Sequence, residues 1–236
     1  MIIFITGLVV GTGYTVIKFY SKDLPDINKL KYYQPSESTK IYSADNKLIG
    51  TIFKENRTWV SFYKIPDVMK QAILAIEDSR FYTHNGVDFI GIGRAFVADI
   101  KHEEINQGAS TITMELARNI FLTPRVTIER KIKEIILSFN IEKKFTKEDI
   151  LEFYLNQIYF GSGAYGIESA ASVYFDKKAK DLDLAEASML AGLPAAPSLY
   201  SPYVNMELAK QRKKLVLDRM VQLGYVTPKQ ADEAFD

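Results

Sequence analysis

From residue 67 onward, apolar and polar residues follow the spacing of amphipathic helices. Hydroxyl or acidic residues stand where such helices would begin, and two of them are followed three positions later by an acidic residue, as in a capping box. The expected N-caps are Asp67, Ser110, Thr127, Thr146, Asp183 and Thr227. The pattern therefore predicts a mainly α-helical body.

Before residue 67 the pattern is different. Residues 40–62 alternate between apolar and polar side chains around a turn signal at 44–46, which predicts a β-hairpin. A polar stretch with two prolines precedes it and is typical of a linker. We therefore expect a linker and hairpin region over residues 21–65 and a helical domain over 66–236.

The first residues of the chain carry no charge until Lys18. Roughly sixteen apolar or small residues would form a helix of about 25 Å, a little short of a bilayer core of about 30 Å. We expect a membrane anchor over residues 1–20; a buried helix or an uncleaved signal remnant is the alternative. Lys18 and Lys22 follow this segment, which by the positive-inside rule favours a cytoplasmic body.

Charge and composition narrow the possible chemistry. Thirty basic and twenty-nine acidic side chains give a net charge of +1, so no global field for nucleic acid exists and any anion site must be local. Cysteine is absent, which excludes disulfides, thiolate catalysis and Cys-ligated zinc. His84 and His102 lie in no ligand-spaced cluster, so a zinc site is not expected.

An acidic pair, Glu77 and Asp78, ends an apolar helical run and is followed by Phe81, His84 and Gly86. Acidic pairs are common on exposed helix surfaces. Here the pair stands where a buried helix gives way to a loop, beside an aromatic ring and a histidine. This position makes it a candidate for chemistry.

A second candidate lies on the helix expected from Thr127. Ile128, Ile132, Ile135, Ile136 and Phe139 form its apolar face in this prediction. Arg130, Lys131 and Glu134 fall outside that face, and Arg130 can pair with Glu134 at i, i+4. Two interpretations are open: a solvated face with a weak ion pair, or a cationic patch beside a carboxylate that suits a phosphate group.

A third segment, residues 107–121, has small hydroxylated residues at an expected helix start, with Arg118 two turns further on. Free N–H groups at a helix N-terminus can bind an anion; the alternative is an ordinary capped helix.

The motif GSGAYG at 161–166 fits the glycine spacing of a dinucleotide-binding fingerprint. A helix-like segment precedes it, however, where that fingerprint requires a strand. We expect its glycines to allow tight turns between helices.

Five motifs occur in order: Glu-Asp-x-x-Phe-x-x-His-x-Gly at 77–86, Gly-x-Ser-Thr-x-Thr at 108–113, Arg-Lys-x-x-Glu at 130–134, and two longer stretches at 150–171 and 184–202. Together they resemble the peptidoglycan glycosyltransferases, found in bifunctional penicillin-binding proteins and in monofunctional transglycosylases. The resemblance implies a mainly α fold with a lysozyme-like catalytic lobe and a smaller membrane-proximal lobe. Segment 87–100 is apolar enough to touch the membrane or to be core.

The resemblance also implies a reaction. Lipid II is polymerised into glycan strands by inverting transfer, with undecaprenyl diphosphate as the leaving group. Glu77 would be the base, its pKa raised by burial, and Glu134 would assist the leaving diphosphate directly or through a divalent ion, Mg or Mn. No cofactor is expected to be essential. The residues expected to bind substrate are Asp78, Phe81, His84, Ser110, Thr111, Glu115, Arg118, Arg130 and Lys131.

The expected partners are lipid II, the growing glycan strand, the bilayer, and a transpeptidase domain or division and elongation proteins; nucleic acid is not expected. The resemblance places the catalytic domain on the outer face of the bacterial cytoplasmic membrane behind a single span, against the count of local lysines. Transpeptidase signatures are absent from this sequence, so a monofunctional enzyme and one half of a bifunctional enzyme both fit.

The sequence departs from the family pattern in three places. Met114 and Glu115 stand where glutamines are usual, and Arg118 stands where lysine is common. A carboxylate near a diphosphate path adds like-charge repulsion unless a metal or Arg118 compensates. Met114 and Glu115 therefore favour a second possible function, a non-catalytic scaffold that binds lipid II. A third, a muramidase or lytic transglycosylase that cuts glycan, stays open because the implied fold is lysozyme-like.

Overall fold

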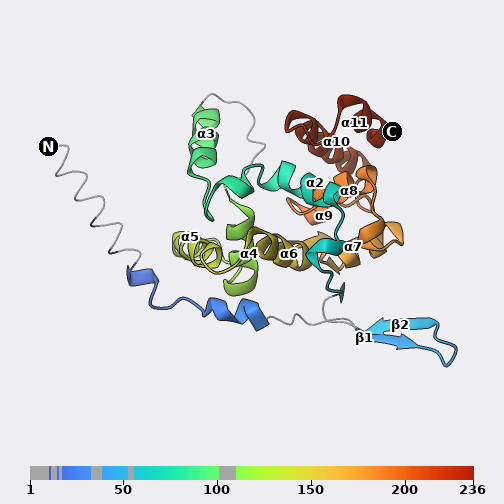
Figure 1. The fold of residues 1–236 in the computed structure, drawn as a ribbon, viewed down its shortest axis with the longest axis horizontal. Coiled ribbons are helices and arrows are strands. Elements are labelled where there is room, and N and C mark those ends of the chain that lie inside the picture. Colours follow the sequence, from blue (N-terminus) through green and yellow to red (C-terminus); the bar gives the residue numbers. More distant parts are fainter. Residues whose placement is uncertain (1–10, 12–14, 16–17, 33–38, 53–55, 101–109) are drawn as a thin grey trace.

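The computed structural model describes residues 11, 15, 18–32, 39–52, 56–100 and 110–236. The α-helices, numbered as in Figure 1, are α2 (Asp67–Glu77), α3 (Phe89–Ile100), α4 (Ile112–Phe121), α5 (Ile128–Glu142), α6 (Lys147–Gln157), α7 (Ile167–Phe175), α8 (Leu184–Ala191), α9 (Pro197–Tyr200), α10 (Met206–Gln222) and α11 (Pro228–Phe235). Short 3-10 helices are η1 (Ile27–Tyr32), η2 (Phe62–Lys64), η3 (Phe81–Thr83) and η4 (Ala179–Asp181). The strands are β1 (Thr39–Tyr42), β2 (Leu48–Ile52), β3 (Asn56–Arg57), β4 (Tyr159–Gly161) and β5 (Ala164–Tyr165). The prediction of a mainly α fold with a small β element is confirmed.

Four of the predicted helix starts are confirmed. The side chains of Thr127, Thr146, Asp183 and Thr227 each accept a hydrogen bond from the backbone N–H three residues later. Two are wrong. Pro66 occupies the N-cap of α2, so Asp67 is its first helical residue. Thr111, with extended backbone, caps α4, and Ser110 lies one residue outside the cap.

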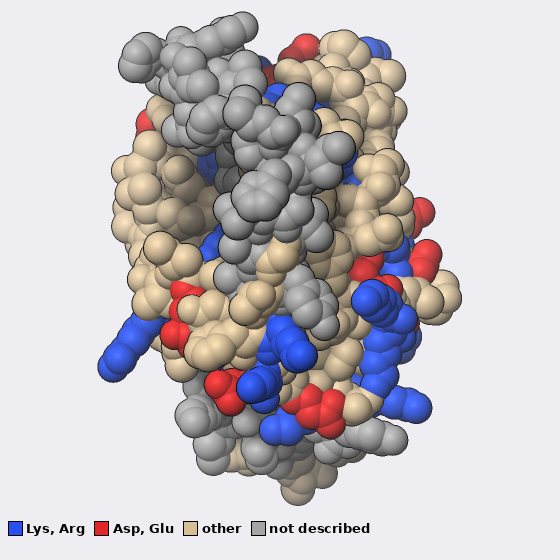
Figure 2. Space-filling model, turned by 90° about the vertical axis from the view of Figure 1, so that its left-hand side faces the viewer, with Lys and Arg blue, Asp and Glu red and all other residues tan. Residues whose placement is uncertain are grey.

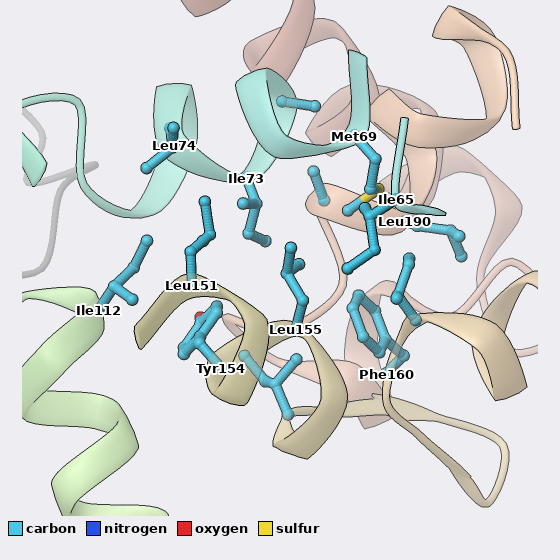
Figure 3. Close-up of a cluster of buried hydrophobic side chains, with 14 of the residues drawn as sticks. Ile65, Met69, Ile73, Leu74, Ile112, Leu151, Tyr154, Leu155, Phe160 and Leu190 are labelled. Atoms are coloured by element: carbon cyan, nitrogen blue, oxygen red, sulfur yellow. The ribbon is translucent and has the colours of Figure 1, made fainter. Parts of the chain in front are cut away.

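The core forms where α2 meets α6, α8 and the start of α4. Figure 3 shows Ile73 of α2 facing Leu151 and Leu155 of α6, with Ile112 of α4 and Leu190 of α8 at the edges of the same cluster. All five side chains are fully buried, and each such burial stabilises the fold by about 1.5–3 kcal/mol. The cluster fixes α2, and with it the acidic residue at the helix end.

The face of α5 that is buried differs from the predicted one. Ile128 is 83% exposed, and of the predicted stripe only Ile136 is buried. The buried residues of α5 are Glu134, Ile136, Leu137, Ser138 and Ile141, and Glu134, Leu137, Ser138 and Ile141 share one helix face. Two polar residues can occupy core positions there because both have partners: Glu134 has two cations, and Ser138 donates to the carbonyl of Ile135.

The predicted hairpin is confirmed for its first part only. β1 and β2 pair antiparallel, with Thr39 opposite Ile52, and Figure 1 shows them projecting away from the helices. β3 instead pairs parallel with β5, which pairs antiparallel with β4. The GSGAYG motif forms the β4–β5 turn between α6 and α7, and its three glycines all have positive φ. Glycine-driven tight turning is thus confirmed at this motif.

Two side chains of α6 hold the extended segment that leads into the body. Asn156 accepts the Val60 N–H and donates to the Val60 carbonyl, both at 2.8 Å. Glu152 accepts from the Trp59 indole at 3.0 Å and from the Phe62 N–H at 2.6 Å. A strand partner would make the same backbone bonds, so α6 replaces one here.

The predicted anchor, residues 1–20, lies mostly outside the described residues. Within the described part of the chain, no helix combines the length and the apolar character needed to cross a membrane. Helix α3 stands apart from the other helices in Figure 1, and Phe89 and Ile90 at its start are 67% and 63% exposed. The division into a lysozyme-like lobe and a membrane-proximal lobe stays a prediction.

Candidate active site

Glu77 is the last residue of α2 and has an unusual environment. Its Oε1 atom is buried and takes no hydrogen bond from the described residues. A buried polar atom without a hydrogen-bond partner costs free energy. Glu77 Oε1 can therefore accept a hydrogen bond from a group that the described residues do not supply.

The charges around Glu77 act in both directions. Burial is the main cause that raises the pKa of Glu77 to about 8, and the negative charge of Glu115 adds to it. Arg212 and Arg118 lower the pKa, and Asp78 raises it slightly. A carboxyl group with a pKa near neutrality can accept a proton and release it at working pH.

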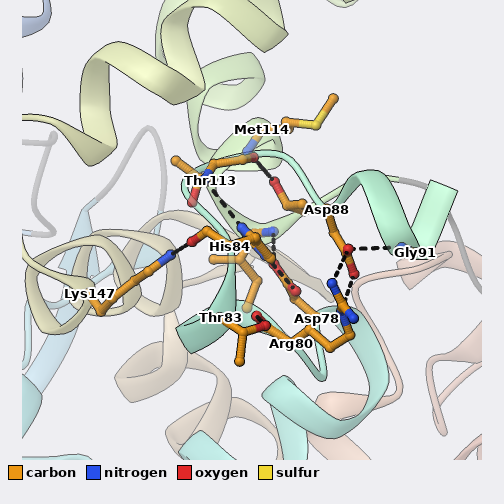
Figure 4. Close-up of polar contacts among 12 residues, drawn as sticks. Asp78, Arg80, Thr83, His84, Asp88, Gly91, Thr113, Met114 and Lys147 are labelled. Atoms are coloured by element: carbon orange, nitrogen blue, oxygen red, sulfur yellow. Dashed lines mark hydrogen bonds and ion pairs between the residues drawn. The ribbon is translucent and has the colours of Figure 1, made fainter.

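Asp78 and His84 are tied to one another and to α4. Both carboxylate oxygens of Asp78 lie close to His84 Nε2, at 2.9 and 3.0 Å, and Asp78 Oδ2 accepts the Ile112 N–H at 3.0 Å (Figure 4). The Gly86 N–H donates to His84 Nδ1 at 3.2 Å, so the ring proton is on Nε2 and points to Asp78. Both side chains are buried, which suits a supporting role.

Glu134 lies on α5 and is 1% exposed. Arg130 Nε lies 3.0 Å from its Oε1, and Lys131 Nζ lies 3.1 Å from its Oε2. The interpretation as a solvated face with a weak ion pair is therefore wrong, because the carboxylate is buried and paired twice. The Lys131 side chain remains 42% exposed, and its Nζ also donates to Ser110 Oγ at 2.8 Å.

The start of α4 connects these two acidic sites. Lys131 Nζ donates to Ser110 Oγ at 2.8 Å, and two residues later the Ile112 N–H reaches Asp78. Thr111 Oγ1 donates to the Gly86 carbonyl at 2.6 Å and also caps α4. The structure thus brings the predicted motifs at 77–86, 108–113 and 130–134 into one region.

Met114 and Glu115, which stand where the family pattern has glutamines, lie in different surroundings. Met114 is 1% exposed and packs in the interior. Glu115 accepts from Arg118 Nη2 at Oε1 and from the Tyr154 hydroxyl at Oε2, both at 3.2 Å. Burial raises the pKa of Tyr154 well above its ordinary value, so the phenol stays protonated and remains a donor. Arg118 and Tyr154 thus stabilise the Glu115 carboxylate.

Phe81 is 1% exposed and packs edge-on against His84, with Lys147 Nζ 4.3 Å from its ring centroid. Phe81 is part of the buried core, and contact of Phe81, Asp78 or His84 with a substrate stays a prediction.

The sequence did not point to Arg212, although its charge lowers the pKa of Glu77. Arg212 lies in a basic run on α10 that resembles a solvated face, so the sequence offered no signal for it.

The predicted divalent ion has little support from the side chains. Among the described residues, no group of three or more His, Asp or Glu is placed to hold a metal ion. Both oxygens of Glu134 already face cations. These residues do not form a metal site by themselves, and a cation at the diphosphate stays a prediction.

Surface charge is mixed rather than concentrated. On the face in Figure 2, Lys and Arg intermingle with Asp and Glu over the lower part. This distribution agrees with the net charge of +1. Cations paired with a buried or half-buried carboxylate of the predicted site lie at Glu134 and Glu115.

Comparison with known proteins is consistent with this geometry. The chain is 47% identical over 230 residues to penicillin-binding protein 1A of Aquifex aeolicus, covering 98% of this chain and 32% of that protein. It is 44% identical to penicillin-binding protein 1A of Neisseria gonorrhoeae, covering 97% and 29% respectively. The chain therefore spans about a third of the length of these relatives.

The fold has a counterpart among solved structures. Penicillin-binding protein 1A from Haemophilus influenzae aligns with a TM-score of 0.51 and 25% identity, over 86% of this chain and 21% of the other. A family model described as transglycosylase matches residues 45–221 and includes both acidic sites. The chain belongs to the transglycosylase family.

Proposed function

We propose that this chain is a peptidoglycan glycosyltransferase that polymerises lipid II into glycan strands with inversion, releasing undecaprenyl diphosphate. Family membership and the similarity to penicillin-binding proteins 1A support the activity. The observation that carries the chemical part is the buried, unpaired Oε1 of Glu77.

Glu77 is proposed as the general base. The acceptor sugar hydroxyl gives its proton to the Glu77 carboxylate while its oxygen forms a bond to the anomeric carbon of the donor. The bond from that carbon to the diphosphate oxygen breaks, and the electron pair leaves with the diphosphate. A pKa raised to about 8 by burial and by Glu115 makes Glu77 a stronger base than an ordinary carboxylate.

The departing diphosphate needs positive charge. Arg130 and Lys131 are proposed to supply it, held in place by Glu134; the Lys131 side chain is the more exposed of the two, which favours its contact with a phosphate oxygen. Arg118, Ser110 and Thr111 are proposed as further contacts. A divalent ion, if it takes part, would be carried mainly by the diphosphate oxygens, because both oxygens of Glu134 already face cations.

The enzyme is proposed to work at the outer face of the bacterial cytoplasmic membrane, where lipid II and the growing strand are its partners. The exposed Phe89 and Ile90 at the start of α3 support contact with a bilayer. The relatives named penicillin-binding protein 1A support a transpeptidase domain as a further partner.

Polymer formation from purified lipid II tests the proposal. Wild type should form glycan strands, Glu77→Gln should not, and a parallel reaction with a chelator tests the divalent ion. Near wild-type polymerisation by Glu77→Gln would show that the base is assigned wrongly. Tight lipid II binding without turnover would favour the scaffold, and release of soluble fragments from purified cell wall without a lipid-linked donor would favour the muramidase.

A further inference from the structure

The loop between α2 and α3, residues 78–88, begins directly after Glu77 and is held against three helices. Gly86 has a φ of 95°, and a Cβ atom there would lie 2.9 Å from the backbone of Ser138 on α5. This close approach requires glycine. Asp78, His84 and Gly86 of the loop all bond to one another or to α4, as described above.

A lysine outside the predicted site fastens the middle of this loop. Lys147, in the first turn of α6, donates from Nζ to the His84 carbonyl and to Glu142 Oε1, both at 2.8 Å (Figure 4 shows the bond to His84). The same ammonium lies 4.3 Å from the Phe81 ring centroid. The Lys147 side chain is 18% exposed, so these contacts replace most of its hydration.

Glu142 carries the connection to α4. It is the last residue of α5, its side chain is 6% exposed, and its Oε1 also accepts the Thr113 hydroxyl at 2.6 Å. Its Cγ lies 3.2 Å from where a Cβ of Gly86 would be. The Lys147–Glu142 pair therefore joins the 78–88 loop, α4, α5 and α6 at one point.

We propose that Lys147 and Glu142 are positioning residues for the glycosyl transfer: they fix the 78–88 loop and so the carboxylate of Glu77. The inference rests on the proposed function. Lys147 holds the His84 carbonyl, the His84 ring holds Asp78, and Asp78 is the neighbour of Glu77. A displacement of about 1 Å, caused far from the reacting atoms, can lower a rate by about 10²-fold.

Steady-state lipid II polymerisation by Lys147→Met, with melting temperatures measured in parallel, tests this. Methionine keeps an unbranched stem but removes the donor to the His84 carbonyl and leaves Glu142 with Thr113 as its remaining donor in the described structure. We expect kcat to fall by about 10²-fold with little change in KM, because Arg130 and Lys131 remain in place. Lys147→Arg should recover most of the lost rate, since a guanidinium can donate to both acceptors.

Lys70→Met is the matched control. The Lys70 side chain is 13% exposed, pairs with Asp67 at 2.6 Å and lies 4.2 Å from the Phe62 ring centroid, so its surroundings resemble those of Lys147. It makes no bond to the 78–88 loop in the described structure. The control should keep its kcat even where its melting temperature falls.

The activity of Lys147→Met, compared with that of Glu77→Gln and Lys70→Met, decides whether Lys147 has a positioning role. If Glu77→Gln is inactive while folded Lys147→Met keeps kcat within about threefold, or loses no more than Lys70→Met, the positioning role is overturned and the proposed function stands. If wild type makes no polymer, both proposals fall. Should Lys147→Met not fold, Thr113→Val removes a single bond to Glu142; a lowered kcat supports the proposal and a wild-type kcat overturns it.

Discussion

The two predicted acidic residues, Glu77 and Glu134, are both carboxylates withdrawn from solvent, yet their surroundings are opposite. Glu77 has a buried oxygen without a donor and another acid, Glu115, close enough to raise its pKa. Glu134 has a cation at each oxygen. Burial alone therefore does not decide what a carboxylate does, because its charged neighbours determine whether it takes a proton or holds cations.

This difference separates two roles within one reaction. A group that must accept a proton benefits from destabilisation of its charged form, whereas a group that orients cations must stay ionised. The start of α4 contacts both sites: the Ile112 N–H donates to Asp78 beside Glu77, and Ser110 accepts from Lys131 beside Glu134.

The largest effect is expected from Glu77→Gln. The amide keeps the shape of the side chain but cannot act as a base, so lipid II polymerisation should fall by about 10²–10⁴-fold. Because the substituted carboxyl has no hydrogen-bonded partner at Oε1, the melting temperature near neutral pH should stay the same or rise. A large fall in melting temperature with retained activity would reverse the two roles.

Glu134→Ala should instead destabilise the fold. Removal of one member of a buried pair leaves Arg130 without its partner, and the cost is about 3 kcal/mol, at the low end for buried pairs because Lys131 is partly exposed. Urea unfolding at equilibrium measures the change. An unfolding free energy equal to that of wild type would show that the pair contributes nothing.

Stability should depend on pH through Glu77. Its pKa is raised from 4.5 to about 8 in the folded state, so the native protein binds a proton that the unfolded chain has released. The stabilisation from the protonated form is fully present below pH 4.5 and is lost as the pH rises towards 8. Melting temperatures from pH 5 to 9 should show this loss in wild type and a smaller one in Glu77→Gln; identical curves would rule it out.

The smallest effect is expected from Glu115→Gln. The change removes a negative charge that raises the pKa of Glu77, so the acidic limb of the pH dependence of kcat/KM should move to lower pH. Glutamine Oε1 can still accept from the Tyr154 hydroxyl, so the fold should hold. An unmoved limb would mean that Glu115 does not act on the group that controls the rate.

Local signals in the sequence predicted much of the fold. The caps at Thr146 and Asp183 depend on residues three positions apart, and the apolar run before Glu77 forced that side chain towards the interior. The error at Ser110 also has a local origin, because Ser110 and Thr111 are adjacent hydroxyl residues with the same capping chemistry. Residue order alone could not choose between them.

The rest depends on partners that are distant in the chain. The prediction of the apolar face of α5 was wrong because a hydrophobicity pattern treats Glu134 and Ser138 as exposed. Both residues are buried in the structure, where each has a partner. Lys147 donates to a carbonyl 63 positions away, and no spacing rule covers such a bond. Arg212 acts on Glu77 from a helix near the end of the chain.

The hold of α6 on Val60 has a mechanical consequence. The side-chain amide of Asn156 both accepts from and donates to the Val60 backbone, and Glu152 accepts from Trp59 and Phe62. A pull on the chain upstream of β3 would therefore act on β5 and α6 before it could pass along the backbone to Glu77. The carboxylate at the end of α2 is thereby separated from a load applied at the β1–β2 hairpin.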